Sequence, residues 1–296
     1  MSDTDITSVG LLSVELGQLS VLGTGLWGLV FDLGDGTALK LARRRCAGIG
    51  DGLSKIKREA DVLRAIHATG YRSTLAITEV LNWGERSNQD LAAGDPSLWL
   101  RTTIVPGRVR TSLELEKLSK QAARTICASI AGAITAVHKM LQQSAPSLEI
   151  PTATETLQGV VGEMHNDPEG KTYATRLLKI LESLEDKPSP VIHGDFNLSN
   201  VLFEGSTVCS VVDFAETRRG FYEEDLAAII AELPSYRNIL IEEFETVTGY
   251  SIIESRLDYG LAMKAFFSFI IARRLGNDGQ RSVARCLLEK ALKEIF

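Results

Sequence analysis

The chain has 296 residues, 44% of them hydrophobic and 24% charged, so it can bury a sizeable core, and its length favours two lobes over one. No apolar run approaches the roughly 20 residues that span a bilayer, and the first residues lack a basic flank, so we expect a cytoplasmic protein that does not enter a membrane. The net charge of −6 is unevenly distributed: residues 1–140 hold 17 Lys and Arg against 14 Asp and Glu (+3), and residues 141–296 hold 15 against 24 (−9). The single short arginine cluster does not favour nucleic-acid binding.

Residues 1–105 have the pattern of an antiparallel sheet with one helix, and we expect them to form an N-terminal nucleotide-binding lobe. Residues 19–42 predict a strand, a glycine turn, a strand, a tight turn at Asp35-Gly36 and a third strand. Apolar residues then recur at 3.6-residue spacing over 53–68, which predicts a helix. Further strands are expected near 75–83 and 98–105, and Pro106-Gly107 ends this half of the chain.

Residues 106–296 read as mostly helical, and we expect them to form a C-terminal catalytic and substrate-binding lobe. The clearest helix covers 122–141, and a stretch rich in Pro, Ser and Thr at 144–156 predicts a loop. A helix is expected near 172–184, two short strands at 201–203 and 208–212, and helices at 224–232, 237–247, 255–274 and after Ser282. The four cysteines are far apart with no Cys-x-x-Cys pair, so we expect free thiols.

A glycine-rich turn joins the first two predicted strands. Gly23, Gly25 and Gly28 form a Gly-x-Gly-x-x-Gly pattern, in which the missing side chains let backbone N–H groups approach phosphate oxygens. The dinucleotide-binding version of this pattern opens a helix, whereas here a strand follows, so that interpretation lacks its required context. A plain glycine-rich hairpin remains the alternative for the pattern alone.

Lys40 lies in an apolar strand, where its positive charge requires an anionic partner. On the helix expected at 53–68, Glu59 falls within the apolar stripe, and a carboxylate facing the core is costly unless it is paired. We therefore predict an ion pair between Lys40 and Glu59 that holds the lysine ready for phosphate oxygens. The alternative is that Glu59 lies at the edge of the stripe and reaches solvent.

The most specific segment runs from His193-Gly194-Asp195 to Asn200 and is followed by Asp213 at the end of the next strand. Together these residues supply a carboxylate that can accept a hydroxyl proton and two oxygen ligands of the kind that Mg²⁺ prefers. Each residue has a structural alternative, as a turn former, a cap or a strand-end residue. Their joint order after a glycine turn and a strand lysine favours catalysis over chance.

These residues make the chain resemble the aminoglycoside phosphotransferase and choline kinase branch of the protein-kinase-like family over essentially its whole length. The resemblance implies an α+β, bilobal protein-kinase-like fold, with a small antiparallel-sheet N-lobe and a mostly helical C-lobe. It also implies that Asp195 is the catalytic base, that Asn200 and Asp213 bind Mg²⁺, that Lys40 contacts the nucleotide phosphates and that Glu59 positions Lys40.

The same resemblance implies that ATP or GTP binds between the lobes with Mg²⁺. The base would lie against Val30, Ala38 and Leu202, and the backbone around Thr103 and Ile104 would contact it. By the same likeness Asp225 supports the catalytic loop. His138 matches a recurring family position, but a lone histidine on a helix more often serves packing.

Two features separate this chain from protein kinases. Asn197 stands where protein kinases carry a cation two residues after the catalytic acid, so a further group must neutralise transition-state charge. Only eleven residues separate Asp213 from Asp225, and there is no Ala-Pro-Glu segment, so the chain has no room for a peptide platform. The second feature, together with Gly194 in the place of the arginine that often precedes the catalytic acid in regulated protein kinases, favours a small acceptor bound by the C-terminal half.

We therefore expect an enzyme that transfers a γ-phosphoryl group to a hydroxyl of a small molecule, such as an aminoglycoside-like antibiotic, which would make it a resistance factor. A kinase of choline, homoserine or a sugar and a non-catalytic nucleotide-binding module remain alternatives. A cationic acceptor could bind to acidic side chains near the site, although solvated charges at helix starts explain these equally well. The four candidates are Glu216, Glu223, Glu224 and Glu232. Monomer and homodimer both remain open.

Overall fold

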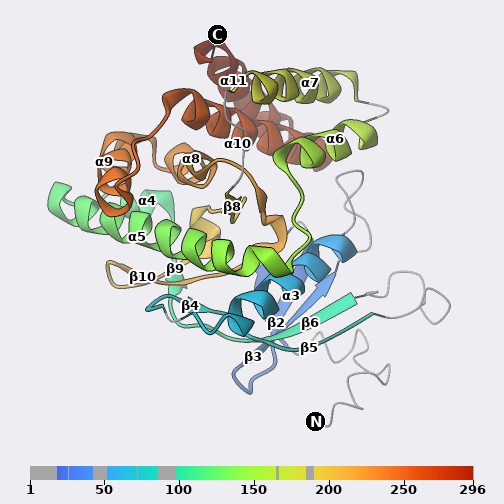
Figure 1. Ribbon diagram of the computed structural model, residues 1–296, viewed down its shortest axis with the longest axis vertical. Coiled ribbons are helices and arrows are strands. Elements are labelled where there is room, and N and C mark those ends of the chain that lie inside the picture. The colour runs from blue at the N-terminus through green and yellow to red at the C-terminus, as the bar shows by residue number, and fades with distance from the viewer. Residues whose placement is uncertain are drawn as a thin grey trace.

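The computed structural model describes residues 19–25, 27–42, 52–71, 73–85, 98–164, 167–184 and 190–295. Within these residues the chain has an antiparallel sheet with one helix near the N-terminus, and helices make up most of the rest (Figure 1). The arginine cluster at 43–45 and Cys46 lie outside the described residues. Cys127, Cys209 and Cys286 are free thiols, as predicted.

The N-terminal sheet has five strands in the order β1-β2-β3-β6-β5, and all its neighbours are antiparallel. The strands are β1 (Ser20–Thr24), β2 (Gly28–Asp32), β3 (Thr37–Ala42), β5 (Val80–Glu85) and β6 (Leu98–Thr103). Gly34 and Gly36 adopt φ values of +77° and +82° in the turn between β2 and β3, which glycine reaches without steric cost. The predicted strand–turn–strand pattern is therefore confirmed.

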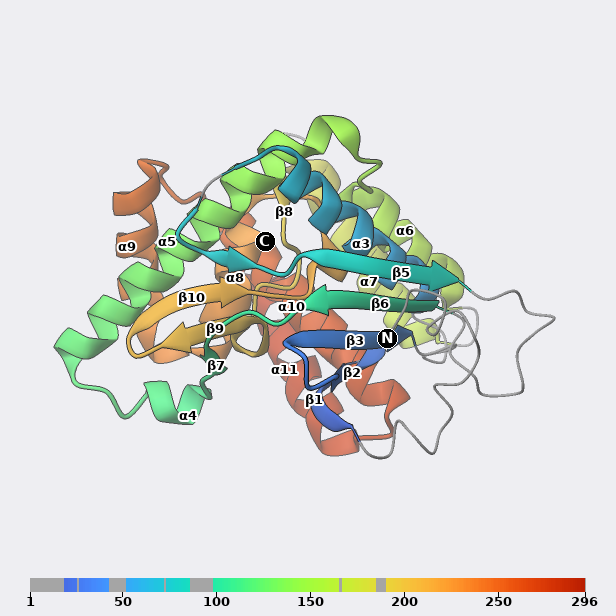
Figure 2. The same ribbon diagram turned by 90° about the horizontal axis from the view of Figure 1, so that it is seen from below.

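Helix α3 (Gly52–Ala68) packs on this sheet, as its apolar stripe predicts. Ile56 and Ala60 are fully buried and form a core cluster with Leu98 and Leu100 of β6. Leu63, one turn further along the helix, instead joins the large core of the C-terminal part. The helix therefore contacts both parts of the molecule. Figure 1 shows it between the N-terminal sheet and the helices of the C-terminal part, and in Figure 2 it is seen next to β5.

A second, four-stranded sheet connects the two halves of the sequence. Its order is β4-β10-β9-β7, formed by β4 (Ala76–Ile77), β7 (Arg108–Val109), β9 (Val201–Glu204) and β10 (Thr207–Val211). β4 comes from the first hundred residues but pairs in parallel with β10. The boundary between lobes at residue 105 stays a prediction, because the chain crosses between the two sheets more than once.

Helices form most of the C-terminal part. They are α4 (Ser112–Leu115), α5 (Lys120–Ser144), α6 (Ala153–Glu163), α7 (Pro168–Ser183), α8 (Tyr222–Glu232), α9 (Arg237–Thr248), α10 (Glu254–Arg274) and α11 (Asp278–Glu294). Ile126, Ile130 and Ile134 of α5 are fully buried, which confirms that its apolar stripe faces a core. Among the helices within the described ranges, none is long and apolar enough to cross a membrane.

The loop predicted over 144–156 is partly wrong, because α6 already begins at Ala153. Thr152 and Glu155 form a capping box: the Thr152 side chain accepts a hydrogen bond from the Glu155 N–H (3.1 Å), and the Glu155 carboxylate accepts one from the Thr152 N–H (2.8 Å). This reciprocal pair is a helix-start signal that the Pro, Ser and Thr content obscured. The helix matters for function because it lines the main cavity.

Helix α10 approaches α8 closely at Gly260. A Cβ placed on this glycine would lie 2.8 Å from the Ala227 Cβ and 2.9 Å from the Glu224 Cα, so no larger residue fits without a shift of backbone. Phe266 and Phe269 of α10 are fully buried in the neighbouring core cluster. This close contact holds α10 against the first two turns of α8.

Candidate active site

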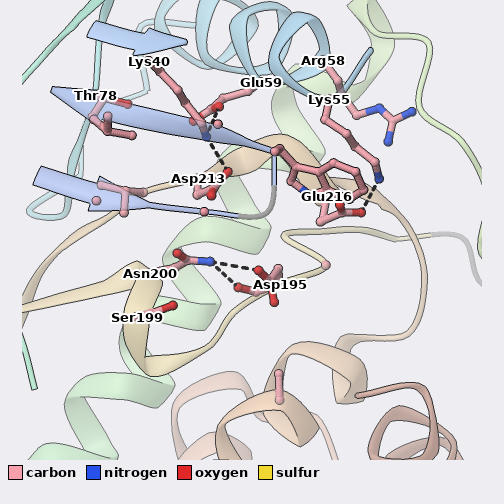
Figure 3. Close-up of a pocket in the computed structure, with 18 of the residues that line it drawn as sticks. Lys40, Lys55, Arg58, Glu59, Thr78, Asp195, Ser199, Asn200, Asp213 and Glu216 are labelled. Atoms are coloured by element: carbon pink, nitrogen blue, oxygen red, sulfur yellow. Dashed lines mark hydrogen bonds and ion pairs between the residues drawn. The ribbon is translucent and has the colours of Figure 1, made fainter. Parts of the chain in front are cut away.

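Three charged side chains from distant parts of the chain meet in the main cavity (Figure 3). The Lys40 Nζ of β3 lies 2.6 Å from the Glu59 Oε2 of α3 and 2.9 Å from the Asp213 Oδ1, just after β10. The ion pair predicted between Lys40 and Glu59 is therefore present, and Glu59 is buried rather than solvated. Asp213 adds a second carboxylate to the pair.

The pKa values of this cluster follow from burial and from the three charges. Burial alone would lower the pKa of Lys40, but Asp213 and Glu59 outweigh it and raise that pKa well above its ordinary value. Burial alone would raise the pKa of Asp213, and the Lys40 ammonium instead holds it below its usual range. Lys40 and Asp213 are therefore both ionised at neutral pH.

Three glycines line the cavity where β1 turns into β2: Gly23 lies in β1, Gly25 in the turn, and Gly28 begins β2. A Cβ on Gly23 would meet nothing within 4 Å, and one on Gly25 would meet only the Gly28 carbonyl at 3.7 Å. A Cβ on Gly28 would lie 2.6 Å from the Leu41 carbonyl oxygen in the neighbouring strand. Gly28 is thus required for strand packing, whereas Gly23 and Gly25 leave open space in which backbone can approach a ligand.

The residues expected around a nucleotide base also line this cavity. Val30, Ala38, Leu202, Thr103 and Ile104 all contribute to its wall. However, the backbone N–H groups expected to contact the base are engaged: that of Thr103 donates to the Glu79 carbonyl and that of Ile104 to the Gly36 carbonyl, each at 3.0 Å. The base contacts of this segment therefore stay a prediction.

Asp195 and Asn200 are linked by hydrogen bonds across the loop between β8 (Val191–Ile192) and β9. The Asn200 Nδ2 donates to the Asp195 carbonyl oxygen at 2.9 Å and to the Asp195 Oδ2 at 3.2 Å, as Figure 3 shows. The Asn197 Nδ2 donates to the other carboxylate oxygen of Asp195 at 2.7 Å. These contacts turn the amide nitrogen of Asn200 toward Asp195 and leave its Oδ1 as an oxygen donor for a cation.

Asp213 stands in a strained backbone conformation. It is the only described residue other than glycine with a positive φ, at +65°. Such a conformation costs of order 1–3 kcal/mol and persists where the surroundings impose it, which is common at functional sites. The Val212 N–H next to it donates to the Asn200 carbonyl at 3.0 Å, so the two candidate metal ligands are held in adjacent segments.

Asp225 supports the loop that carries Asp195. Its carboxylate accepts hydrogen bonds from the backbone N–H groups of His193 and Gly194, each at 2.8 Å, and the His138 Nε2 lies 2.8 Å from the same carboxylate. Burial would raise the pKa of Asp225, but the contacts with His138 and with the backbone lower it. Asp225 therefore has the structural position that was predicted for it. His138 is stacked on Tyr222 but is also a polar partner of Asp225, so it does more than the packing that was expected of it.

Arg218 holds the other side of the same loop. Its guanidinium donates to the Gly194 carbonyl at 2.8 Å and to the Glu224 carboxylate at 2.8 Å, and both side chains are buried. Gly194 has a φ of +82°, and a Cβ there would collide with the Arg218 guanidinium and the Glu216 carbonyl. A glycine is therefore needed immediately before Asp195, and Arg218 occupies the space that a side chain would take.

The four glutamates that sequence analysis offered for a cationic acceptor all have partners within the protein. Glu223 is fully buried and accepts from the Tyr250 hydroxyl at 2.9 Å, while Glu224 is paired with Arg218. Glu216 lies 2.5 Å from the Lys55 ammonium, and Glu232 accepts from the Leu198 N–H at 2.9 Å. Of the four, only Glu216 and Glu224 line the main cavity, and both are paired with cations of the protein, so their role toward a cationic acceptor stays a prediction.

A cation that sequence analysis missed lies next to Asp195. The Lys264 Nζ of α10 is 3.6 Å from the Asp195 Oδ1 and 3.9 Å from the Glu232 Oε1. Burial raises the pKa of Asp195, and Lys264 partly offsets this increase. A signal was available, because Lys264 is a single charge within an apolar stretch of the 255–274 helix. Lys264 of α10 thus places a positive charge beside Asp195, where the catalytic loop itself carries only the neutral Asn197.

Comparisons with known proteins give the family and the fold of the chain. A model of the phosphotransferase enzyme family matches residues 30–251, which is more than half of the chain. A search of curated proteins found no significant match. Among solved structures, the chain is similar to the complex of APH(2″)-IIIa with GDP and kanamycin, with 12% identity, a TM-score of 0.69 and coverage of 98% of this chain and 97% of the other.

Two further solved structures have a similar fold. One is the complex of gentamicin with APH(2″)-IIa, with 13% identity, a TM-score of 0.65 and coverage of 100% and 99%. The other is a thermostable mutant of the aminoglycoside phosphotransferase APH(4)-Ia with AMP-PNP and hygromycin B, with 17% identity, a TM-score of 0.63 and coverage of 98% and 97%. At these identities the likeness establishes the fold alone. The chain belongs to the phosphotransferase enzyme family and has its protein-kinase-like fold, with an antiparallel N-terminal sheet and a largely helical C-terminal part.

Proposed function

We propose that this protein transfers the γ-phosphoryl group of ATP or GTP to a hydroxyl of a small molecule, with Mg²⁺ as the metal. The observation that carries the proposal is the convergence of Lys40, Asp195, Asn200 and Asp213 on one cavity of about 990 Å³. Such a volume accommodates a nucleotide together with a second small molecule. The residues present fit the metal, because an amide oxygen and a carboxylate are hard donors and Mg²⁺ takes only a few ligands from protein.

In this proposal Asn200 and Asp213 would hold Mg²⁺, which would neutralise part of the phosphate charge when it is bound. Lys40, fixed by Glu59 on one side, contacts phosphate oxygens on the other. Gly23 and Gly25 let the turn between β1 and β2 come close to the phosphates. The nucleotide is then clamped before any chemistry, and alignment is the main requirement of phosphoryl transfer.

Asp195 is the proposed catalytic base. The oxygen of the acceptor hydroxyl forms a bond to the γ-phosphorus, its proton passes to the Asp195 carboxylate, and the bond to the β-phosphate oxygen breaks to release the nucleoside diphosphate. Asn197 and Asn200 orient the carboxylate, with Asn197 bound to its Oδ1 and Asn200 to its Oδ2. Lys264, at 3.6 Å, is the proposed source of the positive charge that Asn197 does not supply.

A small acceptor is favoured over a protein substrate. Between Asp213 and α8, which begins at Tyr222, there is room only for one short 3₁₀ turn (Phe214–Glu216) and the two-residue strand β11 (Arg218–Arg219). This segment is too short for an extended peptide platform. The solved neighbours were studied with kanamycin, gentamicin and hygromycin B, which makes an aminoglycoside one candidate acceptor for this chain. A metabolite kinase and a non-catalytic nucleotide-binding module are the remaining alternatives.

The experiment that tests the proposal is nucleoside diphosphate release with a panel of hydroxylated acceptors, run with wild type, Asp195→Asn and Asp61→Asn. Asp61 is an exposed carboxylate on α3, so it controls for the same chemical change outside the cavity. We expect acceptor-dependent release by wild type and Asp61→Asn, and a loss of at least a hundredfold in Asp195→Asn. Equal release by wild type and Asp195→Asn would show that the catalytic assignment is wrong.

A further inference from the structure

Helix α10 lines the cavity with two parallel rows of side chains. The apolar row is Met263, Phe267 and Ile271, and the polar row is Gly260, Lys264 and Ser268. Members of each row are four residues apart, so each row follows one face of the helix. Because Gly260 permits the close approach to α8, the polar row reaches the loop of Asp195 one turn later, at Lys264.

The apolar row continues onto the helix that the sequence had not predicted. Val160 of α6 lines the same cavity, and Phe267 and Ile271 of α10 are partly exposed there, whereas Met263 is already buried. Pro151, just before α6, adds another apolar surface. A molecule bound beside Asp195 therefore packs its body against hydrophobic side chains, and burial of apolar area is the main source of its affinity.

One positive charge lies next to the reacting position and offsets the negative charges of two carboxylates. The Lys264 Nζ lies 3.6 Å from the Asp195 carboxylate, which must also receive the acceptor hydroxyl, and 3.9 Å from the Glu232 carboxylate. An ammonium group close to that hydroxyl would also meet the Lys264 ammonium within a few ångströms, in a site partly shielded from water, where like charges repel. Lys264 thus weakens the attraction that Asp195 would otherwise exert on an acceptor amine beside the reacting hydroxyl.

Among the described residues, the other carboxylates near this side of the cavity are engaged within the protein. Glu232 accepts from the Leu198 N–H at 2.9 Å and lies beside Lys264. Glu155 caps α6 by accepting from Thr152, at 2.8 and 3.0 Å. Glu216 is paired with Lys55, and Glu224 accepts from both Arg218 and the Phe221 N–H. A polycation would have to displace these internal partners before it could form a single ion pair.

We propose that the acceptor belongs to the class of hydroxyl compounds that have an apolar body and carry no ammonium group near the reacting hydroxyl. This inference rests on the proposed function, because it assumes that the acceptor binds beside Asp195. It goes beyond the fold, since solved neighbours of the same fold were studied with polycationic aminoglycosides. The specificity-determining residues are Lys264 for charge and Phe267 for the apolar contact.

The test measures binding separately from turnover. Wild-type protein loaded with Mg²⁺ and AMP-PNP is titrated calorimetrically with hexyl glucoside, with hexyl glucosaminide, which differs by one amine in place of a hydroxyl, and with methyl glucoside, which lacks the apolar chain. We expect hexyl glucoside to bind at least about tenfold more tightly than either of the other two. Equal or tighter binding of the glucosaminide, or no measurable binding of hexyl glucoside, would overturn the proposal.

Three variants test which residues cause the binding preference. Lys264→Met should reduce the preference against the glucosaminide severalfold, and Phe267→Ser should weaken hexyl glucoside severalfold while AMP-PNP binding stays unchanged. Leu287→Ser, at an exposed apolar position of α11, is the matched control for the second change and should alter neither affinity. An unchanged preference in Lys264→Met would refute the role of this lysine.

The two proposals fail in different ways. If the binding preference is found but no acceptor is phosphorylated in an Asp195-dependent reaction, the proposed catalytic function is wrong and the binding inference stands. If kanamycin is phosphorylated by wild type with a higher kcat/KM than every uncharged acceptor tested, the function stands and the acceptor class is wrong.

Discussion

The replacement Asp225→Asn tests whether the hydrogen bonds of the Asp225 carboxylate fix the backbone that leads to Asp195. The Asp225 Oδ1 accepts from the Gly194 N–H, and the Oδ2 accepts from the His193 N–H and lies 2.8 Å from the His138 Nε2. An asparagine keeps one of these oxygens and replaces the other with an NH₂ group. Whichever way the amide turns, at least one backbone N–H then faces a donor.

The size of the effect follows from these contacts. A hydrogen bond to a charged group contributes about 1.5–3 kcal/mol, and a buried donor left without an acceptor costs about 1–3 kcal/mol. Because Asp225 is 1% exposed, water cannot replace the lost acceptor, and we expect a destabilisation of about 3–5 kcal/mol. The released loop should also misplace Asp195, with a loss of about a hundredfold in kcat.

Urea unfolding followed by circular dichroism, together with nucleoside diphosphate release, measures both effects. His138→Ala is the graded comparison, because it removes one neighbour of the carboxylate and leaves both backbone donors in place, so its destabilisation should be smaller, about 1–3 kcal/mol. Asp61→Asn, exposed on α3, should change neither quantity. An Asp225→Asn protein with wild-type stability and wild-type kcat would refute the reasoning.

Three further predictions concern the charged side chains around the cavity. Glu59→Gln should lower kcat/KM about ten- to hundredfold, because Lys40 loses one of its two carboxylate partners. Steady-state kinetics measures this, and an unchanged kcat/KM would contradict the prediction. Asp213→Ala should raise the Mg²⁺ concentration needed for half-maximal activity at least tenfold, and removal of metal with EDTA should abolish wild-type turnover. Lys264→Met should lower kcat and move the acidic limb of the pH profile to higher pH. Burial raises the pKa of Asp195 and Lys264 opposes that rise, so the pKa should increase when Lys264 is removed. The base loses activity as the pH falls through its pKa, so the loss should begin at a higher pH. A limb that stays in place or moves to lower pH would contradict this role.

Features that depend on local sequence could be predicted. The pairing of Lys40 with Glu59 follows from helical periodicity, because a carboxylate within an apolar stripe needs a partner. The order of Asp195, Asn200 and Asp213 is set within nineteen residues of chain around one β-hairpin, so their proximity needs little tertiary information. The antiparallel N-terminal sheet follows from its turn residues.

Features that depend on packing between distant elements could not be predicted. Lys264 stands out in the sequence as a lone charge in an apolar stretch, but its contact with Asp195 depends on how α10 packs against α8 at Gly260, which no short-range pattern encodes. Glu224 has the sequence signature of a solvated charge at a helix start but pairs with Arg218 inside the protein. The start of α6 could have been predicted, because the Thr152 and Glu155 pair of its capping box is visible in the sequence. The Pro, Ser and Thr content of the segment favoured a loop instead.

A crystal structure with Mg²⁺ and AMP-PNP would test the central claim most directly, namely that one metal-bound triphosphate lies among Lys40, Asn200 and Asp213. We expect the ion about 2.0–2.1 Å from the Asn200 Oδ1 and from an Asp213 carboxylate oxygen. The Lys40 Nζ should lie within hydrogen-bonding distance of a phosphate oxygen, and the Asp195 carboxylate should face the γ-phosphate. A nucleotide bound elsewhere, or an ion that contacts neither Asn200 nor Asp213, would contradict the account.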